Sequence, residues 1–271
     1  MSKFIEVGKL IEARNPSLMR WVPGFVFRWL ERIFHQDDIN GFIDRHGHKN
    51  EYDFSSALVE EFELDLQVKG MENIPPATEA CIFASNHPLG GLDAIAIIHL
   101  FRDVRPDIKF IVNDFLLNLK PLAGRFVGVN LVGKNAVDSL QKIDKQFASD
   151  SATFIFPAGL VSRKNKGQVE DLEWKKAFVV KSKQYDLPVI PMYIDGNMSN
   201  RFYRLAHLRK FLGVKFNFEM LYLVDEMFKQ KKRQISIVIG EPMPASTFGS
   251  GKSNIAWAQW VKEKVYQLKE R

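Results

Sequence analysis

The sequence has few of the features of secreted, disulfide-stabilised or membrane-spanning proteins. It contains one cysteine, Cys81, in an apolar run, which excludes a disulfide framework and favours a reducing compartment. No run of roughly 18 apolar residues occurs, so we expect no transmembrane helix. The start, MSKFIEVGKLIEARNP, carries Glu6 and Glu12 and lacks a continuous apolar stretch, which argues against a signal peptide.

The length and hydrophobic content of the sequence fit a sizeable hydrophobic core. The chain has 271 residues, of which 46% are hydrophobic, enough for one large domain or for one domain with an added helical segment. The formal net charge of +6 favours acidic partners such as membrane surfaces, phosphates or nucleic acid, without choosing among them.

The hydrophobic pattern changes character near residue 62. Residues 1–61 are predicted to form a charged helical segment, a candidate for membrane association, and residues 62–271 to form an α/β domain. We expect a mixed, mostly parallel sheet flanked by helices, with Gly70–Thr78 as the hinge after the helical appendage. The expected strands are Leu64–Val68, Ala80–Ser85, Lys109–Val112, Val127–Val132, Thr153–Phe156, Pro188–Ile194 and Ile235–Ile239. The expected helices are Asp93–Arg102, Ala136–Ser149, Glu173–Gln184, Asn200–Leu212, Glu219–Lys229 and Ser253–Lys269.

The stretch ASNHPLGGLDAI, residues 84–95, places a histidine and an aspartate between two apolar segments. One interpretation is purely structural: Pro88 favours an extended backbone at His87, the glycines allow a tight turn, and Asp93 caps the next helix. The other interpretation is chemical. A histidine at a strand end reaches the cleft beyond the sheet, and an aspartate on its ring fixes the tautomer and stabilises the imidazolium.

A histidine has an unperturbed pKa of ~6.5, which suits a general base. No serine or cysteine stands in a nucleophile elbow here. On the chemical interpretation, His87 would therefore activate an external hydroxyl and not a nucleophile of the protein itself.

Asn86-His87 followed by Asp93 resembles the first signature of the glycerolipid acyltransferase superfamily, which includes the lysophosphatidic acid acyltransferases. Five residues separate His87 from Asp93 here, where four are usual in the family. The longer NHPLGGLD form resembles a bacterial branch related to lyso-ornithine-lipid acyltransferases, often labelled hemolysins. No pore-forming segment supports that label.

Later segments support the resemblance in order, over roughly residues 62–245. FIFPAGLVSRK, residues 154–164, is similar to the family's phosphate-binding block, typically Phe-Pro-Glu-Gly-Thr, with Ala158 and Leu160 in place of the glutamate and threonine. GVNLVGKN, residues 128–135, stands where the second block is expected and offers Lys134 in place of an arginine. LPVIPMYIDG, residues 187–196, resembles the Val-Pro-x-x-Pro strand.

The resemblance implies O-acyl transfer from a thioester carrier to the hydroxyl of a membrane lysolipid, in membrane lipid biosynthesis. The donor would be an acyl carrier protein or coenzyme A thioester, and the acceptor 1-acylglycerol-3-phosphate or a lyso-aminolipid. His87 would be the general base and Asp93 its partner, with no metal and no redox cofactor. The expected substrate-binding residues are Asn86, Gly90, Gly91, Lys134, Gly159, Arg163 and Lys164.

Two other functions stay open at this stage. In a thioesterase-like hydrolase, water would replace the acceptor. The protein could also be a non-catalytic membrane- or lipid-binding protein, a function that the altered phosphate-binding block at residues 154–164 keeps possible.

The basic segments favour a membrane surface over nucleic acid. SRKNKG, residues 162–167, is expected to form a loop after a strand, where Arg163 would hold an anionic group in a forked pair of hydrogen bonds. Residues 201–215 combine five cations with aromatic residues and no acid, and no nucleic-acid fold signature accompanies them. Residues 20–34 predict an amphipathic helix with Trp21 and Trp29 at its boundary, which packs on the core, meets lipid, or does both with different sides. We therefore expect a peripheral protein on the cytoplasmic side of the membrane.

Two further segments resemble functional motifs without their full pattern. FGSGKS, residues 248–253, lacks the first glycine of a phosphate-binding loop, because Ser246 stands there, so it is predicted to end a loop and cap the last helix. RHGHKNEYD, residues 45–53, has no second ligand cluster with zinc spacing and is predicted to be a polar loop.

Overall fold

A computed structural model describes residues 6, 8, 23–129, 136–165, 167–214 and 217–270. The chain divides into two compact units. Unit 1 takes Met1–Lys49 together with Met198–Lys231, and unit 2 takes Asn50–Asn197 together with Lys232–Arg271. Within the described ranges, no helix is both long and apolar enough to cross a membrane.

Unit 1 is helical. It contains α3 (Gly24–Ile33), α4 (Gln36–His46), α9 (Asn200–Phe211), the 3₁₀ turn η4 (Phe218–Tyr222) and α10 (Leu223–Phe228). The His35 ring joins the two chain segments, because it hydrogen-bonds the Asp225 carboxylate at 3.1 Å and stacks on Phe228 with centroids 3.9 Å apart.

The amphipathic helix predicted over residues 20–34 is confirmed for its described part, α3. Ile33 is buried and Val26, Phe27 and Leu30 are partly buried, whereas the charged residues Arg28 and Arg32 are exposed. Trp29 lies at the boundary, 40% exposed, with its ring edge on Tyr222. Trp21 lies outside the described residues.

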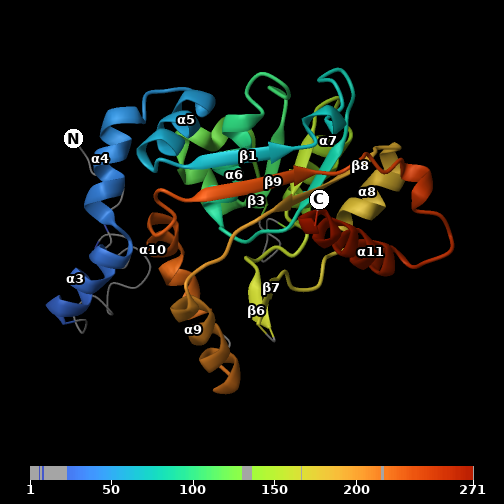
Figure 1. Ribbon diagram of the computed structural model, residues 1–271. Coiled ribbons are helices and arrows are strands. Elements are labelled where there is room, and N and C mark those ends of the chain that lie inside the picture. Colours follow the sequence, from blue (N-terminus) through green and yellow to red (C-terminus); the bar gives the residue numbers. More distant parts are fainter. Residues whose placement is uncertain are drawn as a thin grey trace. The chain divides into compact units, whose positions relative to one another are not determined.

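Unit 2 is built on a seven-stranded sheet with the order β1-β9-β8-β2-β5-β3-β4. Figure 1 shows β1 and β9 side by side at one end of this order. The strands are β1 (Asp65–Lys69), β2 (Ile82–Ser85), β3 (Lys109–Asn113), β4 (Phe126–Val129), β5 (Thr153–Ile155), β8 (Val189–Ile194) and β9 (Gln234–Ile239). Each pair of neighbours in this sheet is parallel except β8 and β9. The predicted mixed, mostly parallel sheet flanked by helices is confirmed.

Helices cover this sheet because its central strands are apolar on both faces. All four residues of β2 and all six of β8 are buried. Ile82 and Ala84 belong to the core cluster that contains residues of α8 (Ala177–Tyr185) and α11 (Asn254–Gln267). Phe83 points the other way, onto Phe101 at the end of α6 (Gly91–Leu100), and α6 packs on α5 (Glu51–Glu61).

The element predictions hold for the sheet and need correction at several helices and loops. Helix α8 begins at Ala177 instead of Glu173, because the buried Trp174 lies in the segment that leads into the helix. The predicted helix Glu219–Lys229 divides into η4 and α10. The expected loop at residues 162–167 is instead the start of an antiparallel hairpin, β6 (Arg163–Asn165) and β7 (Gln168–Glu170).

Side-chain caps explain where two helices of unit 2 begin. The Ser253 side chain accepts hydrogen bonds from the amide of Ala256, so the prediction that FGSGKS caps the last helix is confirmed. The prediction of a polar loop over RHGHKNEYD, residues 45–53, holds only for residues 47–50, because Arg45 and His46 end α4 and Glu51–Asp53 begin α5. Asn50 is the second cap, and its side chain accepts from the amides of Tyr52 and Asp53. Helix α7 (Ala136–Phe147) completes the unit.

Candidate functional site

Three central strands bring the predicted site residues to one edge of the sheet. Strand β2 is parallel to β5 on one side and to β8 on the other, with Ala84 opposite Ile155 and Ser85 opposite Met192. The carboxyl ends of parallel strands meet at the same edge, and ligands of α/β proteins bind beyond it. His87 follows β2 at this edge, and Phe156 follows β5.

The turn between β2 and α6 has a backbone that only glycine adopts easily. Gly90 has φ 70° and ψ −134° and stands directly before the helix, which begins at Gly91. Leu89 is buried against Gly196, just after β8: a Cβ at Gly196 would lie 2.7 Å from a Leu89 methyl carbon. The Gly90 conformation and the packing of Leu89 against Gly196 let the five residues between His87 and Asp93 form a tight turn, which brings the two side chains together.

His87 and Asp93 form a direct hydrogen-bonded pair. The Nδ1 atom of His87 lies 2.9 Å from Oδ2 of Asp93, and the same oxygen accepts the amide of Leu89 at 3.0 Å. The imidazole stacks on Phe156 with ring centroids 3.9 Å apart. Because the carboxylate accepts, Nδ1 carries the proton and Nε2 is the basic nitrogen. The His87 side chain is 19% exposed, whereas that of Asp93 is 0% exposed.

The carboxylate of Asp93 is held in an apolar environment. Burial raises the pKa of Asp93, and the hydrogen bonds from His87 and Leu89 oppose that rise only in part. Its second oxygen, Oδ1, is buried and has no hydrogen-bond partner in the described part of the chain. Asp93 is the third residue of α6, so it does not cap the amides of its own helix as a simple N-cap would.

Asn86, predicted to bind substrate, has its side-chain amide bonded to the neighbouring strand. Its Nδ2 donates to the carbonyl of Ile194 and its Oδ1 accepts the amide of Ile194, each at 2.8 Å. The residue is 3% exposed. This reciprocal pair extends the β2–β8 pairing by one residue and thereby positions the backbone from which His87 projects.

Asp171 was not among the predicted residues, yet it makes a backbone contact with His87. Its Oδ1 accepts the amide of His87 at 3.2 Å and the hydroxyl of Ser162 at 2.6 Å, and its Oδ2 accepts Nε1 of Trp174 at 2.9 Å. Ser162 in turn donates its amide to the carbonyl of His87 at 2.9 Å. Burial raises the pKa of Asp171, with the Ser162 and Trp174 hydrogen bonds acting against it.

Ser162 and Asp171 stand at the two ends of the β6–β7 hairpin, so their contact closes its base beside His87. The sequence did not predict this hairpin, because its strands have three residues each and are mostly polar. Recognising it would have brought Asp171 next to Ser162, and Ser162 already belongs to a segment that resembles a family motif.

Arg163 and Lys164, the predicted anion-binding residues, lie on β6 next to this base. Arg163 is partly buried, pairs in register with Glu170, and donates from Nη1 to the carbonyl of Val161 at 2.9 Å. Lys164 is opposite Val169. Lys134 and Lys166 lie outside the described residues.

The two glycine positions differ in what their amides contact. The amide of Gly159, which has φ 70°, donates to the carbonyl of Phe156 at 2.9 Å, so it is already used within its own turn. The amide of Gly91, the first of α6, donates to no described acceptor, as expected at a helix N-terminus. A further cation, Lys175, approaches the Gly159 turn: a Cβ at Gly159 would lie 3.1 Å from its Nζ.

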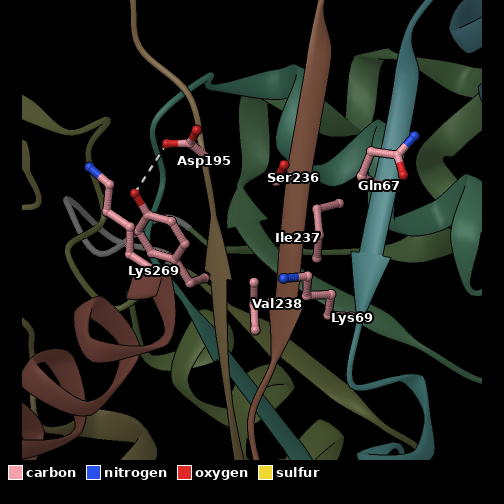
Figure 2. Close-up of a pocket in the computed structure, with 8 residues that line it drawn as sticks. Gln67, Lys69, Asp195, Ser236, Ile237, Val238 and Lys269 are labelled. Atoms are coloured by element: carbon pink, nitrogen blue, oxygen red, sulfur yellow. Dashed lines mark hydrogen bonds between the residues drawn. The ribbon is translucent and has the colours of Figure 1, made fainter. Parts of the chain in front are cut away.

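A depression of about 220 Å³ lies elsewhere on unit 2, over β1, β9 and β8 (Figure 2). Its lining is mixed, with Lys69, Ser236, Val238 and Lys269 among the residues and a hydrogen bond from the Tyr193 hydroxyl to Asp195. None of the predicted site residues lines it. Across the described ranges, no group of three His, Cys, Asp or Glu side chains is arranged to hold a metal ion.

Comparison with known proteins identifies close relatives over nearly the whole chain. The sequence profile of the acyltransferase family matches residues 9–271. The lyso-glycine lipid O-acyltransferase of Bacteroides thetaiotaomicron is 41% identical over 265 residues, 97% of each chain. The enzyme of the same name from Phocaeicola vulgatus is 39% identical over 97% of this chain and 95% of its own.

A solved structure has the same fold. The crystal structure of the 1-acyl-sn-glycerophosphate acyltransferase PlsC from Thermotoga maritima superposes with a TM-score of 0.51 at 21% identity. The match covers 90% of this chain and 96% of that one.

The burial of Asp93 predicts a pH-dependent effect of Asp93→Asn on stability. Since the folded-state pKa is raised, ionisation costs free energy in the folded chain that it does not cost in the unfolded chain. That cost is absent below the ordinary carboxyl pKa of about 4 and develops as the pH rises through the higher folded value. The free energy of unfolding of Asp93→Asn, relative to the parent, should therefore increase between pH about 4 and neutrality.

Urea unfolding over this pH range measures that difference directly. Asp103→Asn, at an exposed position, corrects for the general loss of one negative charge. A difference between Asp93→Asn and the parent that stays flat or falls with rising pH would contradict the prediction.

Proposed function

The chain belongs to the acyltransferase family, and we propose that it transfers a fatty acyl group from a thioester carrier to the hydroxyl of a lysolipid. The observation that carries the proposal is the His87–Asp93 pair, in which Nδ1 is bound to a fully buried carboxylate while the His87 side chain stays 19% exposed. The donor is an acyl carrier protein or coenzyme A thioester, and the reaction belongs to membrane lipid biosynthesis.

The acceptor we propose is a lyso-aminolipid and not 1-acylglycerol-3-phosphate. The names of two relatives at 41% and 39% identity support this choice. The altered phosphate-binding block supports it as well, because Ala158 replaces the glutamate and Leu160 the threonine typical of phosphate-binding members of the superfamily. The protein works from the membrane surface on its cytoplasmic side.

The proposed reaction begins with proton transfer to His87. Nε2 takes the proton of the acceptor hydroxyl as its oxygen attacks the thioester carbonyl carbon. The tetrahedral intermediate collapses, the carbon–sulfur bond breaks, and the leaving thiolate recovers the proton from the imidazolium. Asp93 stays ionised throughout and stabilises the imidazolium that forms.

The N-terminus of α6 is the proposed site for the negative oxygen of the intermediate. The Gly91 amide is the first of the helix, and its partial positive charge is reinforced by the helix dipole. Gly91 also leaves room for a ligand, because nothing lies within 4 Å of a Cβ built there. The Gly159 amide is a weaker candidate because it already bonds Phe156.

Arg163, together with Lys164, is proposed to hold the anionic group of the acceptor or carrier. Arg163 directly follows Ser162, whose amide donates to the carbonyl of His87. The backbone of Arg163 therefore lies one residue away from a direct contact with His87. Nη1 of Arg163 donates to the carbonyl of Val161. A guanidinium binds a carboxylate or phosphate through a forked pair of hydrogen bonds, which is why an arginine suits this role.

A panel of acceptors tests the proposal as a whole. Purified protein is incubated with a labelled acyl thioester and either a lyso-glycine lipid, lysophosphatidic acid or no acceptor. We expect acylated product with the lyso-glycine lipid, little with lysophosphatidic acid, and little free fatty acid without acceptor. Release of free fatty acid at the same rate in all three would identify a thioesterase-like hydrolase instead.

The pair itself gives the first activity prediction. His87→Ala should lower kcat by ~10²–10⁴-fold, the usual range for general-base catalysis. Asp93→Asn should cause a comparable loss, since the amide keeps the shape of the carboxylate but cannot balance the imidazolium charge. The double variant should be no worse than His87→Ala, because the two residues act as one unit.

His99→Ala is the matched control, since His99 lies on α6 and bonds Ser56 instead. Full activity of a folded Asp93→Asn protein would show that the carboxylate is only structural.

The second activity prediction concerns Arg163. Arg163→Lys keeps the charge but loses the planar fork, so it should mainly raise the apparent KM for the acceptor or the carrier, with a smaller effect on kcat. Arg163→Ala should raise it further. Steady-state kinetics in which each substrate is varied in turn identifies which of the two the guanidinium holds. Unchanged constants for Arg163→Ala would remove Arg163 from the site.

Asp171 is proposed to position His87 through its backbone, which predicts a loss in kcat without contact to substrate. Asp171→Asn replaces one acceptor oxygen by an NH₂ group, so at least one of the three donors of His87, Ser162 and Trp174 loses its partner. A small displacement of a catalytic group costs up to ~10²-fold, so we expect a kcat loss of about 10–10²-fold with KM little changed.

Trp174→Phe is the control, because it removes one donor to Asp171 and leaves the His87 contact in place. It should lower the melting temperature while kcat stays near the parent value. Equal kcat losses in the two variants would mean that Asp171 acts only through stability.

A further inference from the structure

The C-terminal end of α9 exposes four apolar side chains. Phe211 is 86% exposed, Leu212 60%, Leu208 49% and Val214 38%. We call these four residues the apolar tip. Large apolar residues scattered singly over a surface are ordinary, but a cluster within seven residues of chain marks a contact surface.

The apolar tip is held by a defined turn. Gly213 adopts φ 66°, and the amide of Val214 returns to the carbonyl of Arg209 at 3.1 Å. The guanidinium of Arg209 donates to the carbonyl of Val214 at 3.1 Å and to the carboxylate of Glu219 at 2.9 Å. Because Glu219 is fully buried, this ion pair anchors the turn within unit 1.

The opposite side of α9 is anchored as well. Phe202, Tyr203 and Ala206 are buried, so that side packs within unit 1. The first turn is fixed by Ser199, which caps the helix and donates its hydroxyl to the buried Glu226 at 2.7 Å. The helix therefore presents the apolar tip in one direction and cannot turn it inward without losing these contacts.

The charges around the apolar tip have one sign. Arg204 and Lys210 are exposed on α9, and Arg204, Leu208 and Phe211 fall on one helical side at spacings of four and three. Residues 200–214 contain no aspartate or glutamate. Exposed apolar side chains at a helix end, bordered by cations, match an anionic lipid surface: the cations meet headgroups and the apolar groups enter the acyl boundary.

We propose that the apolar tip inserts into anionic bilayers and docks the protein on the membrane. This inference rests on the proposed function in one respect: the acceptor lysolipid is taken from that same membrane. It goes beyond that function by assigning the membrane contact to the end of α9.

A single fluorescent label tests insertion. Cys81 is fully buried, and burial raises the pKa of its thiol to about 12, so it reacts poorly with maleimides. A cysteine introduced by Phe211→Cys then carries an environment-sensitive dye alone. On anionic vesicles its emission should shift to the blue and be quenched by lipids with brominated acyl chains. The same dye on Ile255→Cys, an apolar position 37% exposed on α11, should stay in water.

Substitutions of the apolar tip test its contribution to binding. Phe211→Ser and Leu212→Ser should each weaken partition onto anionic vesicles by about tenfold, since each removes a large buried apolar side chain from the bound state. Ile255→Ser should leave partition unchanged. High salt should weaken binding of every variant, because it screens the cations of α9. Circular dichroism melts should be unaltered, since the substituted side chains are exposed in the free protein.

The result that overturns the inference is a dye at position 211 that stays in water while the protein is bound to vesicles, or one that is shielded equally in lipid-free protein by self-association. Activity separates this outcome from failure of the proposed function. The apolar-tip variants should lose acylation of acceptors in vesicles but keep it for acceptors dispersed as monomers. If the dye at position 211 enters the bilayer but no lysolipid is acylated, the proposed function is wrong and membrane insertion of the apolar tip is supported. If Phe211→Ser acylates lysolipids in vesicles as fast as the parent, the membrane role of the apolar tip is wrong and the proposed function is supported.

Discussion

The buried carboxylate of Asp93 is the interaction on which the geometry of the site depends. A carboxylate that is 0% exposed is tolerated in an apolar core only when donors meet it at short distance. The donors here are the His87 ring and the Leu89 amide, and both lie on the turn that precedes the helix. The turn must therefore fold back on its own helix, which requires the positive φ of Gly90. The raised pKa of Asp93 reflects the part of the desolvation cost that these donors do not offset.

The turn is held from both sides by polar side chains that bond backbone groups. Asn86 links β2 to the end of β8 through both polar atoms of its amide. Asp171 and Ser162 link the amide and the carbonyl of His87 to the base of the β6–β7 hairpin. These contacts are all made within the protein, so the backbone of His87 is fixed before any ligand binds. Such preorganisation allows a general base to act without rearrangement during the reaction.

Reasoning from the sequence predicted the His87–Asp93 pair and its neighbour Asn86, but it did not include Asp171 or Ser162. The His–Asp pair could be predicted from the sequence because the two residues and the glycines between them lie in twelve consecutive residues, with apolar residues on both sides. Asp171 could not be predicted, because a single aspartate in a polar stretch has no local pattern that distinguishes it from a solvated side chain. The expected loop at residues 162–167 was wrong for a related reason: strands of three residues are too short for alternation to be detected.

The sequence by itself determined the alternation of strands and helices in unit 2, the two fully buried strands β2 and β8, the amphipathic character of α3, and the turn that carries His87 and Asp93. These features depend on residues within a few positions of one another, where periodicity and turn chemistry act. Only the tertiary structure decided the strand order, the partners of Asn86 and Asp171, and the exposure of the apolar tip. The Asn86 and Asp171 contacts join residues 108 and 84 positions apart, so they come into existence only when the sheet places its strand ends side by side. The apolar tip is exposed because α9 packs through its other side, where Phe202, Tyr203 and Ala206 are buried, and this packing arises only in the folded chain.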